Sequence, residues 1–248
     1  MRKMLIFAII FMLISTIAFS KDKEEKVMKE DIIKTSEGDL KITFVGHGTL
    51  IFSFGGKIIH VDPFSQLADY SKLPKADLIL ITHGHQDHLD RSAIDKIKTE
   101  KTHIVSNQDS YDKIKTGIVM KNGDTKTVLN LKIEAVPAYN IVNKRQGDIP
   151  FHPKGDGNGY IITFGDKRVY VAGDTENTPE MKRIKDIEVA FLPMNLPYTM
   201  TPEMVADAAK AFKPRILYPY HFGETDTSKL VDLLKNEKDI NVRIRDME

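Results

Sequence analysis

The sequence predicts one α/β domain in which helices pack on the outside of β-sheets. Short runs rich in β-branched and aromatic residues recur from Leu40 onward, separated by glycine, proline, asparagine and aspartate. Stretches with helical apolar spacing and capping residues lie between these runs. The 248 residues suffice for one sizeable domain, and no internal repeat or low-complexity linker follows residue 38. Strands that alternate with helices in one unit favour sheets covered by helices.

The predicted strands begin with three neighbouring runs at residues 41–45, 50–54 and 57–61, where Gly55-Gly56 supplies a tight hairpin turn. Residues 78–82 form a continuous apolar run, which is typical of a strand buried on both faces. The later predicted strands cover residues 104–106, 131–136, 159–164, 168–172, 189–192 and 216–218.

Four helices are predicted from capping residues and helical spacing. They cover Asp90 or Ser92 to Lys98, residues 108–115, residues 202–212 behind an N-cap at Thr201, and Asp226 or Thr227 to Leu234.

The first twenty residues have the three parts of a secretory signal peptide. Arg2 and Lys3 form a short basic start, residues 4–14 are an unbroken apolar run, and residues 18–20 provide a cleavage site. The alternative is an uncleaved anchor helix, because the apolar run approaches the ~20 residues that a membrane span needs. We expect removal of residues 1–20, and export to the periplasm or the extracellular space without stable membrane insertion. Residues 21–38 are then a flexible lead-in, and residues 39–248 are the functional domain.

Composition narrows the partners and the metal chemistry. Cleavage would remove two of the 36 basic residues and leave 34 against 35 acidic ones, so no strong field would recruit nucleic acid or anionic lipid. The sequence contains no cysteine, which excludes disulfides and a lipid-modified cysteine. Any metal must therefore be held by histidine, aspartate or glutamate. The expected partner is a small-molecule substrate, and the composition is also compatible with an oligomer.

His83, His85, Asp87 and His88 lie within six residues, directly after the buried run. Imidazole is the commonest metal donor in proteins, and histidine with aspartate suits zinc, manganese or iron. His83 and His85 project to the same side of an extended backbone and can hold one ion. Asp87 and His88 lie beyond a turn and can face a second ion, as in two-metal hydrolases. The alternative is a solvent loop in which three of eight histidines cluster by accident.

The motif His83-x-His85-x-Asp87-His88 resembles the signature of the metallo-β-lactamase superfamily. Asp174, in Gly173-Asp174-Thr175, is similar to the bridging aspartate of the family, and His221 is similar to its last histidine. Further landmarks are similar to the branch that contains ascorbate-6-phosphate lactonase and N-acyl-phosphatidylethanolamine-type phospholipase D; they lie at residues 45–49, 61–63, 192–193 and 198–200. The resemblance covers residues 40–222. It implies a four-layer αββα sandwich with a site for two divalent ions along one edge, zinc being favoured over manganese or iron.

Several of these residues have a structural alternative. Asp174 could be only a turn former, and His221 could be a hydrogen-bonded core histidine. Asp62 could support the ligand loop or form a turn. His47 could line the pocket or be structural. For the two remaining histidines a structural role is favoured for His60 and solvent exposure for His103.

The sequence departs from the family pattern at the third histidine of the first metal site. Asn140 stands where that histidine belongs, and an amide oxygen is a weak ligand that suits hard ions better than zinc. His152 is the nearest unassigned histidine, and we expect it to fold back and complete the site. Asn140 or a water is the alternative ligand, in which case manganese or iron fits better than zinc. The segment 143–158 around His152 is either a surface insertion or a wall that shapes the substrate pocket.

The predicted chemistry is hydrolysis by a metal-bridged hydroxide. In this scheme Asp174 bridges the ions, while Asp87 ligates the second ion and orients the hydroxide. Asn195 and Tyr198 are candidates to stabilise the developing oxyanion, with a loop-anchoring role as the alternative. The favoured substrate is a small ester, lactone or amide. The alternatives are a phosphodiesterase of the same fold, or a metal-binding scaffold without turnover; the intact set Asp87, Asp174 and His221 argues against the scaffold.

Overall fold

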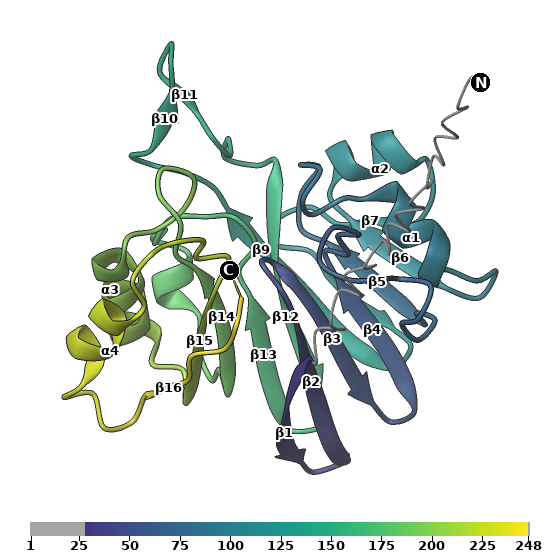
Figure 1. Cartoon of the computed structure of the whole chain (residues 1–248), viewed down its shortest axis with the longest axis horizontal. Coiled ribbons are helices and arrows are strands. Elements are labelled where there is room, and N and C mark those ends of the chain that lie inside the picture. Colours follow the sequence, from purple (N-terminus) through teal and green to yellow (C-terminus); the bar gives the residue numbers. More distant parts are fainter. Residues whose placement is uncertain (1–27, 248) are drawn as a thin grey trace, which may run out of the picture.

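The computed structural model of the chain describes residues 28–247 (Figure 1). The predicted signal peptide and its cleavage site lie outside these residues. Among the described residues, no helix has both the length and the apolar character that a membrane crossing requires.

The first of two large sheets has seven strands in spatial order along the chain. They are β1 (Lys29–Thr35), β2 (Gly38–Gly46), β3 (Thr49–Phe54), β4 (Lys57–Val61), β5 (Leu78–Ile81), β6 (His103–Ser106) and β7 (Ile118–Val119). Strands β1 to β4 pair antiparallel, and β4 to β7 pair parallel. Gly55 and Gly56 both have positive φ in the turn between β3 and β4, which a tight hairpin requires.

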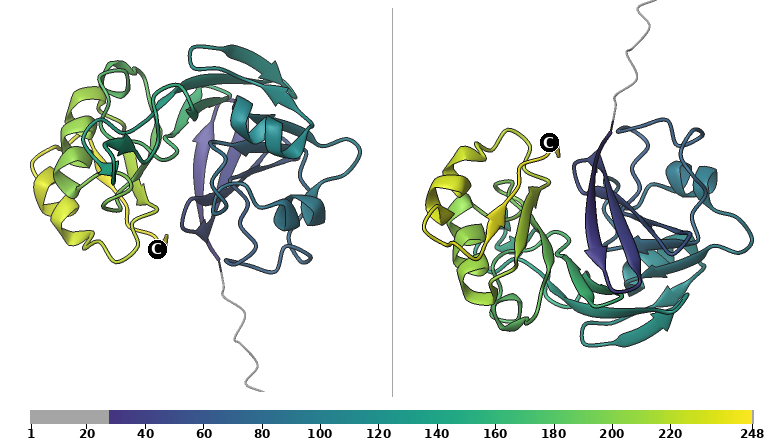
Figure 2. Two further views of the ribbon diagram at one scale, coloured as in Figure 1. Left: turned by 90° about the horizontal axis from the view of Figure 1, so that it is seen from above. Right: turned by 90° about the horizontal axis from the view of Figure 1, so that it is seen from below.

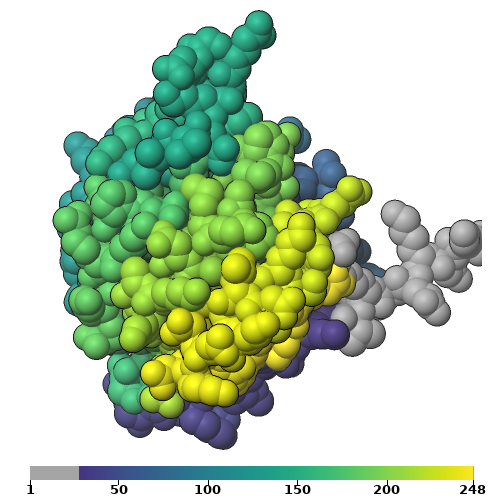
Figure 3. All heavy atoms as spheres, turned by 90° about the vertical axis from the view of Figure 1, so that its left-hand side faces the viewer, coloured from purple at the N-terminus to yellow at the C-terminus, as the bar shows by residue number. Residues whose placement is uncertain are grey.

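The second sheet repeats this division into an antiparallel and a parallel half. Its order is β16 (Asn241–Val242), β15 (Ile216–Tyr220), β14 (Val189–Pro193), β13 (Lys167–Val171), β12 (Gly157–Phe164), β9 (Leu131–Ala138) and β8 (Thr125–Val128). Strands β13 to β16 pair parallel and the others antiparallel. The short strands β10 (Lys144–Arg145) and β11 (Ile149–Pro150) form a separate hairpin. We call residues 141–151 the arm, because they project beyond the body of the protein (Figures 1 and 3).

Helices cover the outer side of each sheet (Figure 2). The elements α1 (Arg91–Ile97) and α2 (Gln108–Ile114) accompany the first sheet. The second sheet is covered by α3 (Pro202–Phe212) and α4 (Ser228–Leu234), with the 3-10 turn η1 (Met181–Arg183) beside α3. Asp90 caps α1, Asn107 caps α2 and Thr201 caps α3 through side-chain hydrogen bonds. The four-layer αββα sandwich is therefore confirmed.

The main core lies between the two sheets and contains aromatic pairs that cross from one to the other. The ring centroids of Phe44 and Tyr218 are 5.0 Å apart, and those of Phe52 and Phe164 are 5.5 Å apart. Strand β5 is buried on both faces, as its apolar run predicts: Leu78 and Leu80 join the main core, while Ile79 and Ile81 pack in a second cluster with α1. Such a strand is held rigidly, and the metal motif follows it directly.

The flexible lead-in predicted for residues 21–38 is wrong from Lys29 onward. Residues Lys29–Thr35 form the edge strand β1, which pairs along its whole length with β2. Ile33 is buried against the main core. Asp31 accepts hydrogen bonds from Arg245, which lies near the C-terminal end of the sequence, with Nη2 and Oδ2 2.6 Å apart. The charged composition concealed a strand in which Glu30 and Lys34 pair with residues of β2 and Asp31 with distant residues.

Candidate metal centre

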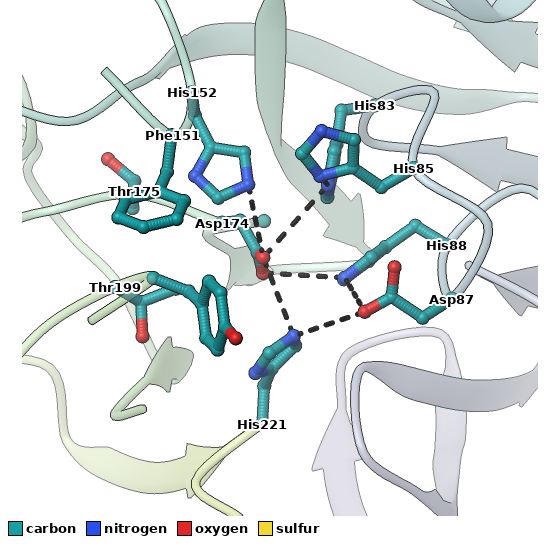
Figure 4. Close-up of polar contacts among 12 residues, drawn as sticks. His83, His85, Asp87, His88, Phe151, His152, Asp174, Thr175, Thr199 and His221 are labelled. Atoms are coloured by element: carbon teal, nitrogen blue, oxygen red, sulfur yellow. Dashed lines mark hydrogen bonds and ion pairs between the residues drawn. The ribbon is translucent and has the colours of Figure 1, made fainter. Parts of the chain in front are cut away.

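The predicted metal residues gather at one edge of the sandwich, where several strands end. His83 to His88 follow β5, Asp174 follows β13, and His221 follows β15. His152 comes from the loop between the arm and β12. Figure 4 shows these side chains converging from both sheets on a common centre.

One group of donors consists of His83, His85 and His152. One ligand atom from each lies within 4.8 Å of the others. The Nε2 atom of His83 is 3.1 Å from Nδ1 of His85. Three imidazoles at this spacing form a coherent set for one divalent ion.

A second group consists of Asp87, His88, His221 and His47, whose ligand atoms also lie within 4.8 Å of one another. The Oδ2 atom of Asp87 is 3.6 Å from Nε2 of His88, 3.7 Å from Nε2 of His221 and 3.1 Å from Nε2 of His47. His47 therefore lies at the centre and lines the pocket. From the sequence, a structural role for His47 was the alternative.

Asp174 stands between the two groups and faces both. Its Oδ2 atom is 3.3 Å from Nε2 of His152 and 4.0 Å from Nε2 of His83, on the first side. On the second side, Oδ2 is 3.4 Å from Nε2 of His221, and Oδ1 is 3.5 Å from Nε2 of His88. This is the position that a bridging carboxylate occupies, and a role limited to turn formation does not explain it.

Several of the donor atoms are buried and lack hydrogen-bond partners. In the described part of the chain, the buried atoms without a partner include Nε2 of His88, His152 and His221 and Oδ1 of Asp174. Leaving buried polar atoms unpaired is costly, and protein interiors rarely contain several together. Their convergence and their nitrogen and carboxylate chemistry fit divalent cations.

A buried network orients two of the imidazoles from the side away from the centre. Asp62 accepts hydrogen bonds from the amide and the hydroxyl of Thr82, at 2.8 and 2.6 Å, and from Nδ1 of His88 at 2.8 Å. Because the hydroxyl hydrogen of Thr82 points to Asp62, Nδ1 of His83 donates to Thr82 Oγ1, at 3.0 Å. When neutral, both imidazoles thus turn the lone pair of Nε2 toward the centre. Asp62 thus contacts the predicted ligand His88 and the residue before His83, as a supporting role would require.

Asn140 holds His152 in the same way. Its Oδ1 atom accepts hydrogen bonds from Nδ1 of His152 at 2.7 Å and from the His152 amide at 2.8 Å. A carbonyl oxygen has two lone pairs, and both are engaged here. The geometry therefore favours His152 as the ligand and Asn140 as its support.

Glu176, which anchors this support, was not predicted from the sequence. Glu176 is fully buried, and its carboxylate accepts hydrogen bonds from Asn140 Nδ2 at 3.2 Å and from the amides of Ile141, Val142 and Asn143 at 2.7–2.8 Å. Its position two residues after Asp174 was the only available signal. Asn140 and the first residues of the arm are thus fastened to the segment after β13 that also carries Asp174.

The charges of the centre favour a bound cation. Burial opposes protonation of His88, but the carboxylates of Asp174, Asp62 and Asp87 outweigh it and raise the pKa of His88 to about 10. Burial would raise the pKa of Asp174, yet the neighbouring His221 and His88 hold it well below its usual range. Burial and the nearby His88 lower the pKa of His83 well below its ordinary value. A metal-free centre therefore keeps a proton on His88, and metal uptake must displace it.

A pocket of about 510 Å³ opens onto the centre, a size suited to a small molecule. Asn195 and Tyr198 line it, as their predicted role requires, and so do Arg145 and Phe151 from the arm. The segment 143–158 thus forms a pocket wall. Of the other histidines, His60 is buried with Nε2 3.1 Å from the Pro74 carbonyl, and His103 is exposed, as expected.

Comparison with known proteins agrees with the fold and the donor set. The model of the beta-lactamase superfamily domain matches residues 41–221. Fold, motif and match together define the chain as a member of the metallo-β-lactamase superfamily.

Relatives of the chain define a narrower group. A UPF0173 metal-dependent hydrolase of Solibacter usitatus is 31% identical over 226 residues, which cover 84% of this chain and 94% of the relative. Another, from Thermococcus onnurineus, is 32% identical over 74% of this chain and 85% of its own. The chain belongs to the UPF0173 metal-dependent hydrolase family.

Two solved structures extend this comparison. A protein of Parabacteroides distasonis, provisionally described as a metal-dependent hydrolase, is 50% identical with a TM-score of 0.86, covering 90% of this chain and 100% of its own. Igni18, a metallo hydrolase of Ignicoccus hospitalis, is 26% identical with a TM-score of 0.70, covering 84% and 96%.

Proposed function

We propose that this metal-dependent hydrolase uses two divalent ions, with zinc favoured, to cleave a small ester, lactone or amide. The observation that carries the proposal is Asp174, whose carboxylate faces one donor group on each side. Bound there, divalent ions would lower the pKa of a water and polarise the oxygen of the bond under attack. His83, His85 and His152 would hold the first ion, and Asp87, His88 and His221 the second, with Asp174 shared.

The residues around the centre would bind and orient the substrate. Burial would raise the pKa of Asp87, but the nearby His221 and a hydrogen bond with His47 hold it well below its usual range. Asp87 therefore stays ionised and can accept a hydrogen bond from the attacking water, which fixes its direction. Asn195 and Tyr198 stand at the pocket wall, where side-chain N–H and O–H groups can donate to the developing oxyanion.

The similarity to the branch of ascorbate-6-phosphate lactonase and N-acyl-phosphatidylethanolamine-type phospholipase D supports a lactone or ester over a β-lactam. The phospholipase D of that branch cleaves a phosphodiester, so phosphodiester hydrolysis is the competing activity. The small pocket favours a small substrate over a polymer.

Metal analysis combined with a substrate panel tests the proposal. Protein purified without chelator should carry about two ions per chain and should hydrolyse δ-valerolactone or 4-nitrophenyl acetate faster than bis-4-nitrophenyl phosphate. Asp174→Asn should lose metal and activity, whereas the exposed His103→Ala should keep both. Faster cleavage of the phosphodiester would establish the competing activity, and no bound metal after reconstitution with zinc, manganese and iron would refute the two-ion site.

We further propose that the protein acts after export, on the basis of the signal-peptide pattern of residues 1–20. N-terminal sequencing of the exported protein should find a start near Lys21. A retained Met1 would support a membrane anchor instead.

A further inference from the structure

The pocket beside the metal centre contains one cationic side chain. Among its lining residues, Arg145 is the sole lysine or arginine. Asp87 and Asp174, the two acidic residues of the lining, face the donor groups and would be neutralised by bound ions. The positive charge of Arg145 would then have no counterpart in the pocket.

Local contacts hold Arg145 at the pocket wall. It lies on β10, paired with Ile149 of β11, and its Nη2 atom donates to the carbonyl of Phe151 at 3.2 Å. The guanidinium lies over the Phe151 ring, 5.4 Å from the centroid. That ring meets the ring of Tyr198 edge-on, with centroids 5.1 Å apart. Phe151 directly precedes His152, so these contacts tie the arginine to the segment that carries a predicted metal ligand.

Arg145 has no carboxylate partner within the described residues, in contrast to its neighbour. Lys144, on the same strand, forms an ion pair with Asp148 at 2.7 Å and does not line the pocket. A guanidinium has five N–H donors in a planar fork, and the carbonyl of Phe151 occupies one of them. The remaining donors can bind a carboxylate or a phosphate group bidentately.

We propose that Arg145 is a specificity-determining residue, and that the substrate carries a carboxylate or phosphate group beside the bond to be cleaved. In this arrangement the anionic group binds the guanidinium. The part of the substrate between that group and the cleaved bond lies along the aromatic pair Phe151 and Tyr198. The inference rests on the proposed function only in taking this pocket as the substrate site.

Calorimetric titration with non-hydrolysable probes tests whether Arg145 recognises an anionic group. Glutarate offers one carboxylate to the metal centre and one to Arg145, 3-phosphonopropionate replaces one of them by a phosphonate, and glutaramide is the neutral counterpart. Because charge-assisted hydrogen bonds are lost, Arg145→Ala should weaken binding of the anionic probes roughly tenfold or more. The probe with the larger loss identifies the preferred group. Binding of glutaramide should not change.

Lys144→Ala is the matched control, since it removes a positive charge from the same strand outside the pocket. It should leave all three affinities within about twofold, and Arg145→Lys should recover part of the loss, because lysine keeps the charge without the fork. Equal losses of affinity for the anionic probes in Lys144→Ala and Arg145→Ala would refute the proposal. So would an Arg145→Ala protein that also binds glutaramide more weakly, or one that binds all three probes as before. The readout is binding, so failure to hydrolyse any ester would refute the proposed function and leave this result intact.

Discussion

His88 and His152 are supported in different ways, although both face Asp174. His88 lies in the first sheet's motif loop and donates directly to a buried carboxylate, Asp62. His152 comes from the loop after the arm and donates to an amide, Asn140, which in turn contacts the buried carboxylate of Glu176. The rigid strand β5 needs one supporting residue for its ligand. The loop that carries His152 needs a chain of two, Asn140 and Glu176, and Glu176 also fixes the backbone at the start of the arm.

The largest effect should come from Asp62→Ala. The substitution leaves the Thr82 amide and Nδ1 of His88 without an acceptor in a fully buried site. Breaking a buried charged pair costs about 3–5 kcal/mol. Urea unfolding of the metal-free protein measures this loss, and Asp62→Asn, which retains an acceptor oxygen, should lose less. A loss below about 1 kcal/mol in Asp62→Ala would show that the network does not support the fold.

His152→Ala should remove about one metal ion per chain and most of the activity. Only two ligands of its own, His83 and His85, would then remain for the first ion, since the carboxylate of Asp174 is shared with the second ion. Tight sites use three or more protein ligands. Elemental analysis after gel filtration measures the stoichiometry, with His103→Ala as the histidine control. Full metal content in His152→Ala would contradict its role as a ligand.

Asn140→Ala and Glu176→Gln should have a smaller effect than His152→Ala. Residues that orient a ligand typically contribute about 10- to 100-fold to metal affinity or activity. Competition with a chelator of known affinity measures the change. If Asn140→Ala instead lost a whole ion while His152→Ala kept it, Asn140 would be the ligand and the segment around His152 only a pocket wall.

The smallest effect is a pH dependence of the unfolding free energy. It arises from His88, which donates to a carboxylate, and not from His152, which donates to an amide. The pKa of His88 in the folded metal-free protein is raised to about 10, above its value near 6.5 in an unfolded chain. Its contribution to stability is therefore complete below pH 6.5 and declines as pH rises through 10. Between pH 7 and 8 the metal-free protein should lose roughly 1 kcal/mol of unfolding free energy from this group. Zinc-loaded protein should lack this loss, and equal slopes with and without zinc would contradict the assignment.

The local part of the site could be predicted from the sequence, and the supporting part could not. His83, His85, Asp87 and His88 are adjacent in sequence and follow a recognisable buried run, so their convergence required no knowledge of the fold. His152 could be predicted only because a histidine was missing elsewhere. Glu176 contacts residues more than thirty positions earlier, and nothing in its neighbourhood indicates those contacts. Strand β1 was missed in part for the same reason, because the partners of its partly buried carboxylate, Asp31, lie near the C-terminal end of the sequence.

The pairing of Asp31 with Arg245 joins residues 214 positions apart in sequence. Arg243 and the hydroxyl of Tyr218 contact the same carboxylate. During synthesis, this contact can form only after the chain has been made through Arg245, by which time every predicted ligand, His221 included, already exists. A chain that ends before Arg245 could still pair β1 with β2, but it would lack this contact and, if it ends before His221, a complete donor set.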